Sequence, residues 1–308
     1  MIVRRPKVGA YIGKVFSLAL TFAALCRGPA QGQNLFVTTQ VDGLVYEFTP
    51  DGVQSAFAAG LYLPFSLAFD SAGNLFVGDL GGNIVKFTPS GARSNFASGL
   101  QAVGLTFDGA GNLFASENQT DSIYEITPEG TYSTFATGLD VARGLVFDNA
   151  GNLFEADSGS GKILKFTPDG ARSAFASGLS SPVNLAFDSV GNLFESDWSS
   201  GNIYKFAPGG ERSTFASGLD HPAGLAFDSA GNLFVEDLGG NIYRFTTDGA
   251  RSAFASGIDV PGGLAIQVPE PATWSLLVFG AAALLGMRGR FWVHVSQVIS
   301  FAACSAAR

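Results

Sequence analysis

Two Glu-x-Asp pairs, 40 residues apart, are the side chains whose types and spacing could do chemistry. Glu155 precedes Asp157 and Glu195 precedes Asp197, whereas other copies of the same repeated segment carry Val or Ala in place of the glutamate. Four carboxylates close together would bind a cation or transfer a proton, because Ca²⁺ favours clustered oxygen ligands. The alternative is that each glutamate lies at a solvent-exposed edge or pairs with a lysine, namely Lys162, Lys165 or Lys205.

Other carboxylates recur at equivalent points of the repeat. One set ends a short apolar segment in five of six copies: Asp79, Glu117, Asp157, Asp197 and Asp237. A ring of these groups could bind Ca²⁺, but a residue present in nearly every copy is more simply a turn former that accepts backbone N–H bonds. We therefore interpret this set as turn residues, and likewise a second set: Asp70, Asp108, Asp148, Asp188 and Asp228.

The elements that position these residues repeat with a period of 38 to 40. An Asn-Leu-Phe phrase marks each copy, with its leucine at Leu35, Leu75, Leu113, Leu153, Leu193 and Leu233. Each copy holds four short apolar runs separated by turns rich in Asp, Asn, Pro and Gly. Four short antiparallel strands every 40 residues describe one blade of a β-propeller.

Counting the strands predicts the number of blades and the closure of the ring. The chain enters at a second strand, 34–37, and ends with an unpartnered first strand, 263–266. The predicted fold is therefore an all-β, six-bladed β-propeller of four-stranded blades over residues 34–267. The last strand, near 264, should complete the first blade by pairing near 35, so that no edge stays open.

Three residues break the repeat where first strands begin: Arg143, Asn184 and His221. We expect them near one mouth of the central channel, with Tyr62 and Trp198 on loops of the same side. Aromatic and polar residues around a channel mouth suit a sugar or peptide ligand. The alternative for His221, which precedes Pro222 in a turn, is a solvated side chain. Together with Glu155, Asp157, Glu195 and Asp197 these are the candidate ligand-binding residues.

Composition and charge restrict the partners. Of 308 residues only 14% are charged, while 40 are Gly and 28 are Phe, which favours strands and turns. Residues 34–267 hold 10 basic and 25 acidic side chains, a net charge of −15, so a nucleic-acid partner is excluded. Cys26 and Cys304 both lie outside this body, which therefore has no disulfide framework. No cofactor is expected, with Ca²⁺ as the one cation considered.

The N-terminal segment is predicted to be a signal peptide, residues 1–30. It has a basic start, a short apolar helix from Val15 to Leu25, and small residues before a cut after Ala30. An N-terminal membrane anchor is the alternative, but the apolar run is about half of the ~20 residues that a spanning helix needs. A lipoprotein site at Cys26 is disfavoured by the bulky Leu25 before it.

The C-terminal segment, residues 268–290, carries a short Pro-rich motif, an apolar helix and a basic stop. The motif residues are Pro269, Glu270, Pro271 and Trp274, and the stop residues are Arg288 and Arg290. This segment resembles the PEP-CTERM protein-sorting signal. The resemblance implies transient anchoring in the inner membrane of a Gram-negative bacterium, recognition by an exosortase, and release to the cell surface or extracellular matrix. Members of that family usually end at the basic cluster, whereas residues 291–308 continue here as a tail of unknown role. A permanent C-terminal anchor is the alternative.

The propeller body resembles NHL-repeat proteins, in phrases such as Pro222-Ala-Gly-Leu-Ala-Phe-Asp228 and Gly231-Asn-Leu-Phe-Val235. The resemblance implies a recognition propeller, with some enzyme relatives.

Our leading hypothesis is a non-catalytic surface or matrix module that binds a glycan, peptide or other protein. The alternative is a metal-dependent hydrolase resembling gluconolactonases of the SMP-30 type, with a divalent cation at the channel mouth. The resemblance to such enzymes implies a metal-binding Asn two residues before a first-strand leucine. At the six equivalent positions this chain instead has Phe65, Val103, Arg143, Val183, Ala223 and Gly262, so the expected Asn is missing. A streptogramin-lyase-like activity would need acidic metal ligands beside a channel-mouth histidine. Whether the protein is an enzyme stays open at this point.

Overall fold

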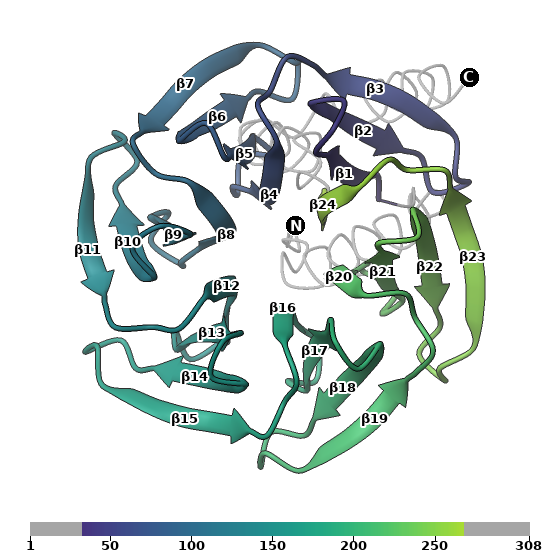
Figure 1. Cartoon of the computed structure of the whole chain (residues 1–308). Coiled ribbons are helices and arrows are strands. Elements are labelled where there is room, and N and C mark those ends of the chain that lie inside the picture. Colours follow the sequence, from purple (N-terminus) through teal and green to yellow (C-terminus); the bar gives the residue numbers. More distant parts are fainter. Residues whose placement is uncertain (1–32, 268–308) are drawn as a thin grey trace, which may run out of the picture.

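The computed structural model describes residues 33–267, which form 24 strands in six four-stranded antiparallel sheets around a central channel (Figure 1). This confirms the predicted all-β, six-bladed propeller. The two predicted terminal helices, the signal peptide and the sorting signal with its tail fall outside the described residues. Within 33–267, no helix is long and apolar enough to cross a membrane.

Each blade runs outward from the channel, and corresponding strands of the six blades occupy corresponding places (Figure 1). We number the blades from the N-terminus, so that blade 1 is β24-β1-β2-β3, blade 2 is β4 to β7, blade 3 is β8 to β11, blade 4 is β12 to β15, blade 5 is β16 to β19 and blade 6 is β20 to β23.

The innermost strands are β4 (Pro64–Phe69), β8 (Ala102–Phe107), β12 (Ala142–Phe147), β16 (Pro182–Phe187), β20 (Pro222–Phe227) and β24 (Pro261–Ile266). The second strands are β1 (Leu35–Thr39), β5 (Leu75–Asp79), β9 (Leu113–Glu117), β13 (Leu153–Asp157), β17 (Leu193–Asp197) and β21 (Leu233–Asp237). The third strands are β2 (Leu44–Phe48), β6 (Asn83–Phe87), β10 (Ser122–Ile126), β14 (Lys162–Phe166), β18 (Asn202–Phe206) and β22 (Asn241–Phe245). The outer strands are β3 (Gln54–Ala58), β7 (Arg93–Ser98), β11 (Tyr132–Ala136), β15 (Arg172–Ser177), β19 (Arg212–Ala216) and β23 (Arg251–Ser256).

The ring closes as the sequence predicts. β24 pairs antiparallel with β1, and the register places Leu35 opposite Ile266 and Val37 opposite Leu264. The two ends of the propeller therefore share one blade, and β1 is paired on both sides like the second strands of the other blades.

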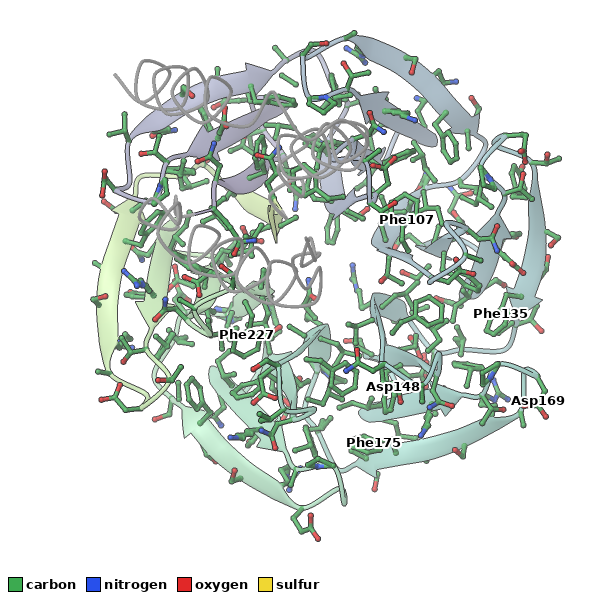
Figure 2. The ribbon with its side chains drawn as sticks, turned by 180° about the vertical axis from the view of Figure 1, so that it is seen from behind. Phe107, Phe135, Asp148, Asp169, Phe175 and Phe227 are labelled. Atoms are coloured by element: carbon green, nitrogen blue, oxygen red, sulfur yellow. The ribbon has the colours of Figure 1, made fainter. Side chains whose placement is uncertain are left out.

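Phenylalanine rings hold neighbouring blades together. Phe154 of β13 makes edge-to-face contacts with Phe175 of its own blade and Phe187 of the next, at centroid distances of 5.1 and 5.2 Å. Edge-to-face pairs at this distance add about 0.5–1.5 kcal/mol beyond simple burial. The same trio recurs at four of the other five interfaces, and four of its rings, Phe107, Phe135, Phe175 and Phe227, are labelled in Figure 2.

The turn between the first and second strands is built by an aspartate, as interpreted from the sequence. In blade 5, one oxygen of Asp188 accepts the backbone N–H groups of Val190 and Asn192 at 3.1 and 2.8 Å, and Gly191 supplies a φ of 86°. These local bonds satisfy the turn without help from another blade. Equivalent bonds confirm the same role for Asp70, Asp108, Asp148 and Asp228.

Candidate functional site

The carboxylates that end the second strands accept hydrogen bonds from backbone N–H groups of the loops, which is the turn-forming role interpreted from the sequence. Asp197 accepts the backbone N–H of Ser180 at 2.7 Å and that of Ser200 at 3.0 Å. Asp157 accepts the N–H of Asp140 at 2.6 Å. Backbone bonds of the same kind confirm this role for Asp79, Glu117 and Asp237.

Glu155 and Glu195 lie elsewhere than the sequence suggested. Both side chains are fully buried, and neither carboxylate has a hydrogen-bond partner among the described residues. The expectation of an exposed edge or a lysine pair is therefore wrong. The amino groups of Lys165 and Lys205 instead lie over the rings of Phe154 and Phe194, at 5.3 and 5.4 Å. The glutamate is buried because its place in the second strand faces the neighbouring blade.

The structure separates these two glutamates. Side chains alternate along a strand, so Glu155 shares a face of β13 with Leu153, which packs on Phe114 of blade 3. Glu195 shares a face of β17 with Leu193, which packs on Phe154 of blade 4. The pairs Glu155–Asp157 and Glu195–Asp197 thus occupy two different interfaces. Within residues 33–267, no three His, Cys, Asp or Glu side chains gather in a way that could hold a metal ion.

Burial determines the charge of these glutamates. Desolvation raises the pKa of Glu155 well above its ordinary value, and the negative charge of Asp157 raises it further. Desolvation and then Asp197 raise the pKa of Glu195 in the same way. The raised pKa values favour the neutral, protonated form of both groups, which lowers the cost of burying them.

A third buried carboxyl, Glu236 of β21, was missed by the sequence reasoning. It faces blade 1. One of its oxygens accepts the N–H of Gly224, in β20 of its own blade, at 3.2 Å, and the other has no partner in the described part of the chain. Burial raises its pKa to about 8. The signal was present, because the other blades carry a small residue here, such as Gly78, Ala156 or Ser196.

One rim of the channel is built from paired loops. In every blade the loop that enters the innermost strand receives a backbone hydrogen bond from the residue that follows the second strand. Examples are Leu80 N–H to Tyr62, Trp198 N–H to Ser181 and Leu238 N–H to Asp220, at 3.2, 2.9 and 2.8 Å. These bonds place Tyr62, Trp198 and His221 on the same rim, in agreement with the prediction.

Trp198, Asp220 and His221 form a polar aromatic cluster on that rim. The rings of Trp198 and His221, from blades 5 and 6, lie 5.1 Å apart. His221 Nδ1 lies 2.7 Å from an oxygen of Asp220, and the two side chains are 47% and 59% exposed. An imidazole oriented by a carboxylate beside an indole face offers stacking and hydrogen bonds to a ligand from solvent.

The same rim carries backbone strain. The residue just before the innermost strand has a left-handed φ in four blades, at Leu63 (49°), Val141 (57°), His221 (51°) and Val260 (38°). This conformation is disfavoured for a residue with a side chain, above all for a β-branched one, and costs about 1–2 kcal/mol. Strain of this kind concentrates at binding sites.

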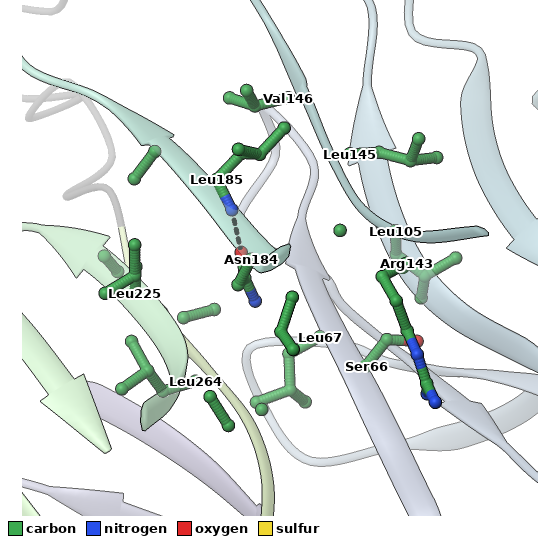
Figure 3. Close-up of a pocket in the computed structure, with 18 of the residues that line it drawn as sticks. Ser66, Leu67, Leu105, Arg143, Leu145, Val146, Asn184, Leu185, Leu225 and Leu264 are labelled. Atoms are coloured by element: carbon green, nitrogen blue, oxygen red, sulfur yellow. Dashed lines mark hydrogen bonds between the residues drawn. The ribbon is translucent and has the colours of Figure 1, made fainter. Parts of the chain in front are cut away.

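Arg143 and Asn184 lie inside the channel rather than on its rim. Both line a cavity of about 290 Å³ that is formed by the six innermost strands, and the other side chains of its lining are apolar except for Ser66 (Figure 3). Arg143 is the one charged side chain among the described residues of that wall, and its guanidinium lies 5.6 Å from the ring of Phe65. Burial lowers its pKa, while Asp121 acts in the opposite direction.

Fold and site together define a six-bladed β-propeller with a ligand-sized channel and a polar aromatic rim. No protein-family model matches the chain, and no curated protein is similar to it in sequence. Among solved structures, the fold is similar to a chain of a nidogen–laminin complex, at 20% identity and a TM-score of 0.69 over 77% of this chain and 99% of that one. A gluconolactonase from Xanthomonas campestris aligns at 18% identity and a TM-score of 0.63, over 79% and 95% of the two chains. A catalytically inactive virginiamycin B lyase from Staphylococcus aureus, with quinupristin, aligns at 16% and 0.59, over 78% and 94%. These likenesses show the fold.

Proposed function

We propose that the chain is an exported, non-catalytic binding propeller that holds a glycan or peptide at the rim of its channel. The observation that carries the proposal is the cluster of Trp198, Asp220 and His221, which is shared between two blades and in which the Asp220 and His221 side chains are about half-exposed. An indole face suits stacking with a sugar ring or an apolar side chain, while the carboxylate and imidazole can bond to hydroxyl or amide groups.

Export rests on the two terminal signals. We propose that residues 1–30 direct secretion, and that an exosortase processes residues 268–290 after transient anchoring in the inner membrane. The product would reside at the cell surface or in the extracellular matrix. In the native bacterium, Glu270→Ala should leave the protein in the membrane fraction, and unchanged release would contradict the sorting proposal.

The binding proposal is tested by screening purified full-length protein against glycan and peptide panels. A ligand of the native state raises the melting temperature by mass action. Trp198→Ala should weaken binding of any hit by about tenfold or more, as expected for a central aromatic contact. Tyr132→Ala, which removes an exposed aromatic from outer strand β11, is the matched control and should leave binding unchanged.

Two results would contradict the proposal. One is a hit whose affinity does not depend on Trp198. The other is metal-dependent hydrolysis of a lactone by the purified protein, which would support the hydrolase alternative.

A further inference from the structure

The six positions that surround the channel differ in chemistry from blade to blade. Each lies two residues before the leucine of an innermost strand, and the six residues are Phe65, Val103, Arg143, Val183, Ala223 and Gly262. The interfaces between blades repeat, whereas this ring does not. Arg143 is the one charged member of this ring.

Arg143 has unused hydrogen-bonding capacity. It makes no ion pair with any described residue, and its guanidinium has no hydrogen bond to the described part of the chain; its close neighbour is the face of Phe65. Guanidinium carries five N–H donors in a planar fork that matches a carboxylate. A half-buried guanidinium without a protein partner has its donors available for an anionic ligand that enters the channel.

Asn184, on the adjacent blade, adds a second donor to the same cavity. Its side-chain oxygen accepts the N–H of Leu185 at 2.7 Å, as the dashed line in Figure 3 shows. Its amide NH₂ makes no hydrogen bond with the described residues and remains free to donate. Ser66 is already engaged, since its hydroxyl donates to the carbonyl of Ala102 at 2.9 Å. The free side-chain groups that Arg143 and Asn184 present to the cavity are therefore donors.

We propose that the channel binds the carboxylate of a small ligand, such as a uronic acid, through the fork of Arg143 and the amide of Asn184. The assignment rests on the proposed binding function, because it names the part of the ligand that enters the channel below the rim. A cavity of about 290 Å³ is at the lower end of small-molecule sites, which fits one sugar residue. The net charge of −15 on residues 34–267 disfavours polyanions.

The test compares glucuronate with glucose, which differ at the carboxylate, and with inorganic phosphate. Titration calorimetry on the full-length protein at low salt should give at least about tenfold tighter binding of glucuronate than of glucose. Arg143→Met, which keeps the apolar stem, should weaken glucuronate binding about 10- to 100-fold. Asn184→Asp, nearly isosteric, should also weaken it, by repulsion between like charges. Arg212→Gln, on the exposed outer strand β19, is the matched control and should change nothing.

Melting temperature separates a binding role from a structural one. Because Arg143 is partly desolvated and has no hydrogen bond to the described residues, Arg143→Met should melt at the same or a higher temperature than the ligand-free parent protein while losing the glucuronate-induced shift. A structural arginine would instead lower the melting temperature when replaced.

The outcomes distinguish this inference from the proposed function. Equal affinities for glucose and glucuronate, phosphate binding without glucuronate binding, or unchanged glucuronate binding by Arg143→Met would each overturn the carboxylate site. Should Trp198→Ala lose a neutral ligand that Arg143→Met retains, the rim function stands and the channel assignment fails. Should glucuronate binding depend on Arg143 but not on Trp198, the channel site stands and the rim proposal fails.

Discussion

The interfaces between blades and the wall of the channel follow opposite rules. At five of the six interfaces, one phenylalanine from a second strand meets two others, at almost the same centroid distances. In the channel, six equivalent positions carry side chains that range from glycine to arginine. Repetition therefore marks the residues that hold the fold together, and departure from repetition marks those free to meet a ligand.

The most severe test of this comparison removes one ring from each region. Phe154→Ala should destabilise the protein by about 3–5 kcal/mol, because it leaves a cavity and ends contacts with Phe175 and Phe187. Phe65→Ala, its matched control in the channel wall, should cost less than half as much. Urea unfolding of both variants gives the comparison, and equal losses would show that the channel wall is as structural as the interfaces.

A smaller effect is expected from the buried glutamates, which are titratable groups inside interfaces made mostly of apolar side chains. Since the pKa of Glu236 is raised to about 8 in the folded protein, its contribution is complete below about pH 4.5 and is lost as the pH rises through about 8. Between pH 5 and 9 we expect a loss of about 2 kcal/mol or more, to which Glu155 and Glu195 add in the same direction.

Glu236→Gln keeps the shape without the titration, so it should flatten the decline of melting temperature between pH 5 and 9. Glu129→Gln, at an exposed turn, is the control and should leave the decline as it is. A Glu236→Gln curve that is parallel to that of the parent protein would mean that Glu236 is charged in the folded state.

The smallest effect concerns backbone strain at the rim. Val141→Gly relieves a left-handed φ of 57° and should stabilise the protein by about 0.5–1 kcal/mol, after the greater flexibility of glycine in the unfolded chain is subtracted. Val190→Gly, at an exposed turn position without a positive φ, should be neutral or slightly destabilising. If Val141→Gly melts below the parent protein, Val141 stabilises the fold in spite of its left-handed φ. The contrast between stabilising interfaces and a strained rim would then be wrong at this position.

Much of the fold could be predicted from the sequence because it is encoded locally and six times over. The Asn-Leu-Phe spacing predicted blade number, the unpartnered segment 263–266 predicted closure on residues near 35, and Asp188 with its equivalents built the expected turns. Each of these features depends on residues within a few positions of one another or on a repeated period. The sequence also determined the uneven ring of Phe65, Arg143 and Gly262, since equivalent positions can be read directly from the repeat.

Tertiary structure alone decided which of the unusual side chains meet. The equivalent face of each second strand borders a different neighbouring blade, so Glu155 and Glu195 are buried in separate interfaces instead of one acidic site. The contact between Trp198 and His221 joins two blades, and the unpaired state of Arg143 depends on what the other five innermost strands place around it. Burial and pairing are properties of the surroundings in space, which a repeat read along the chain does not contain.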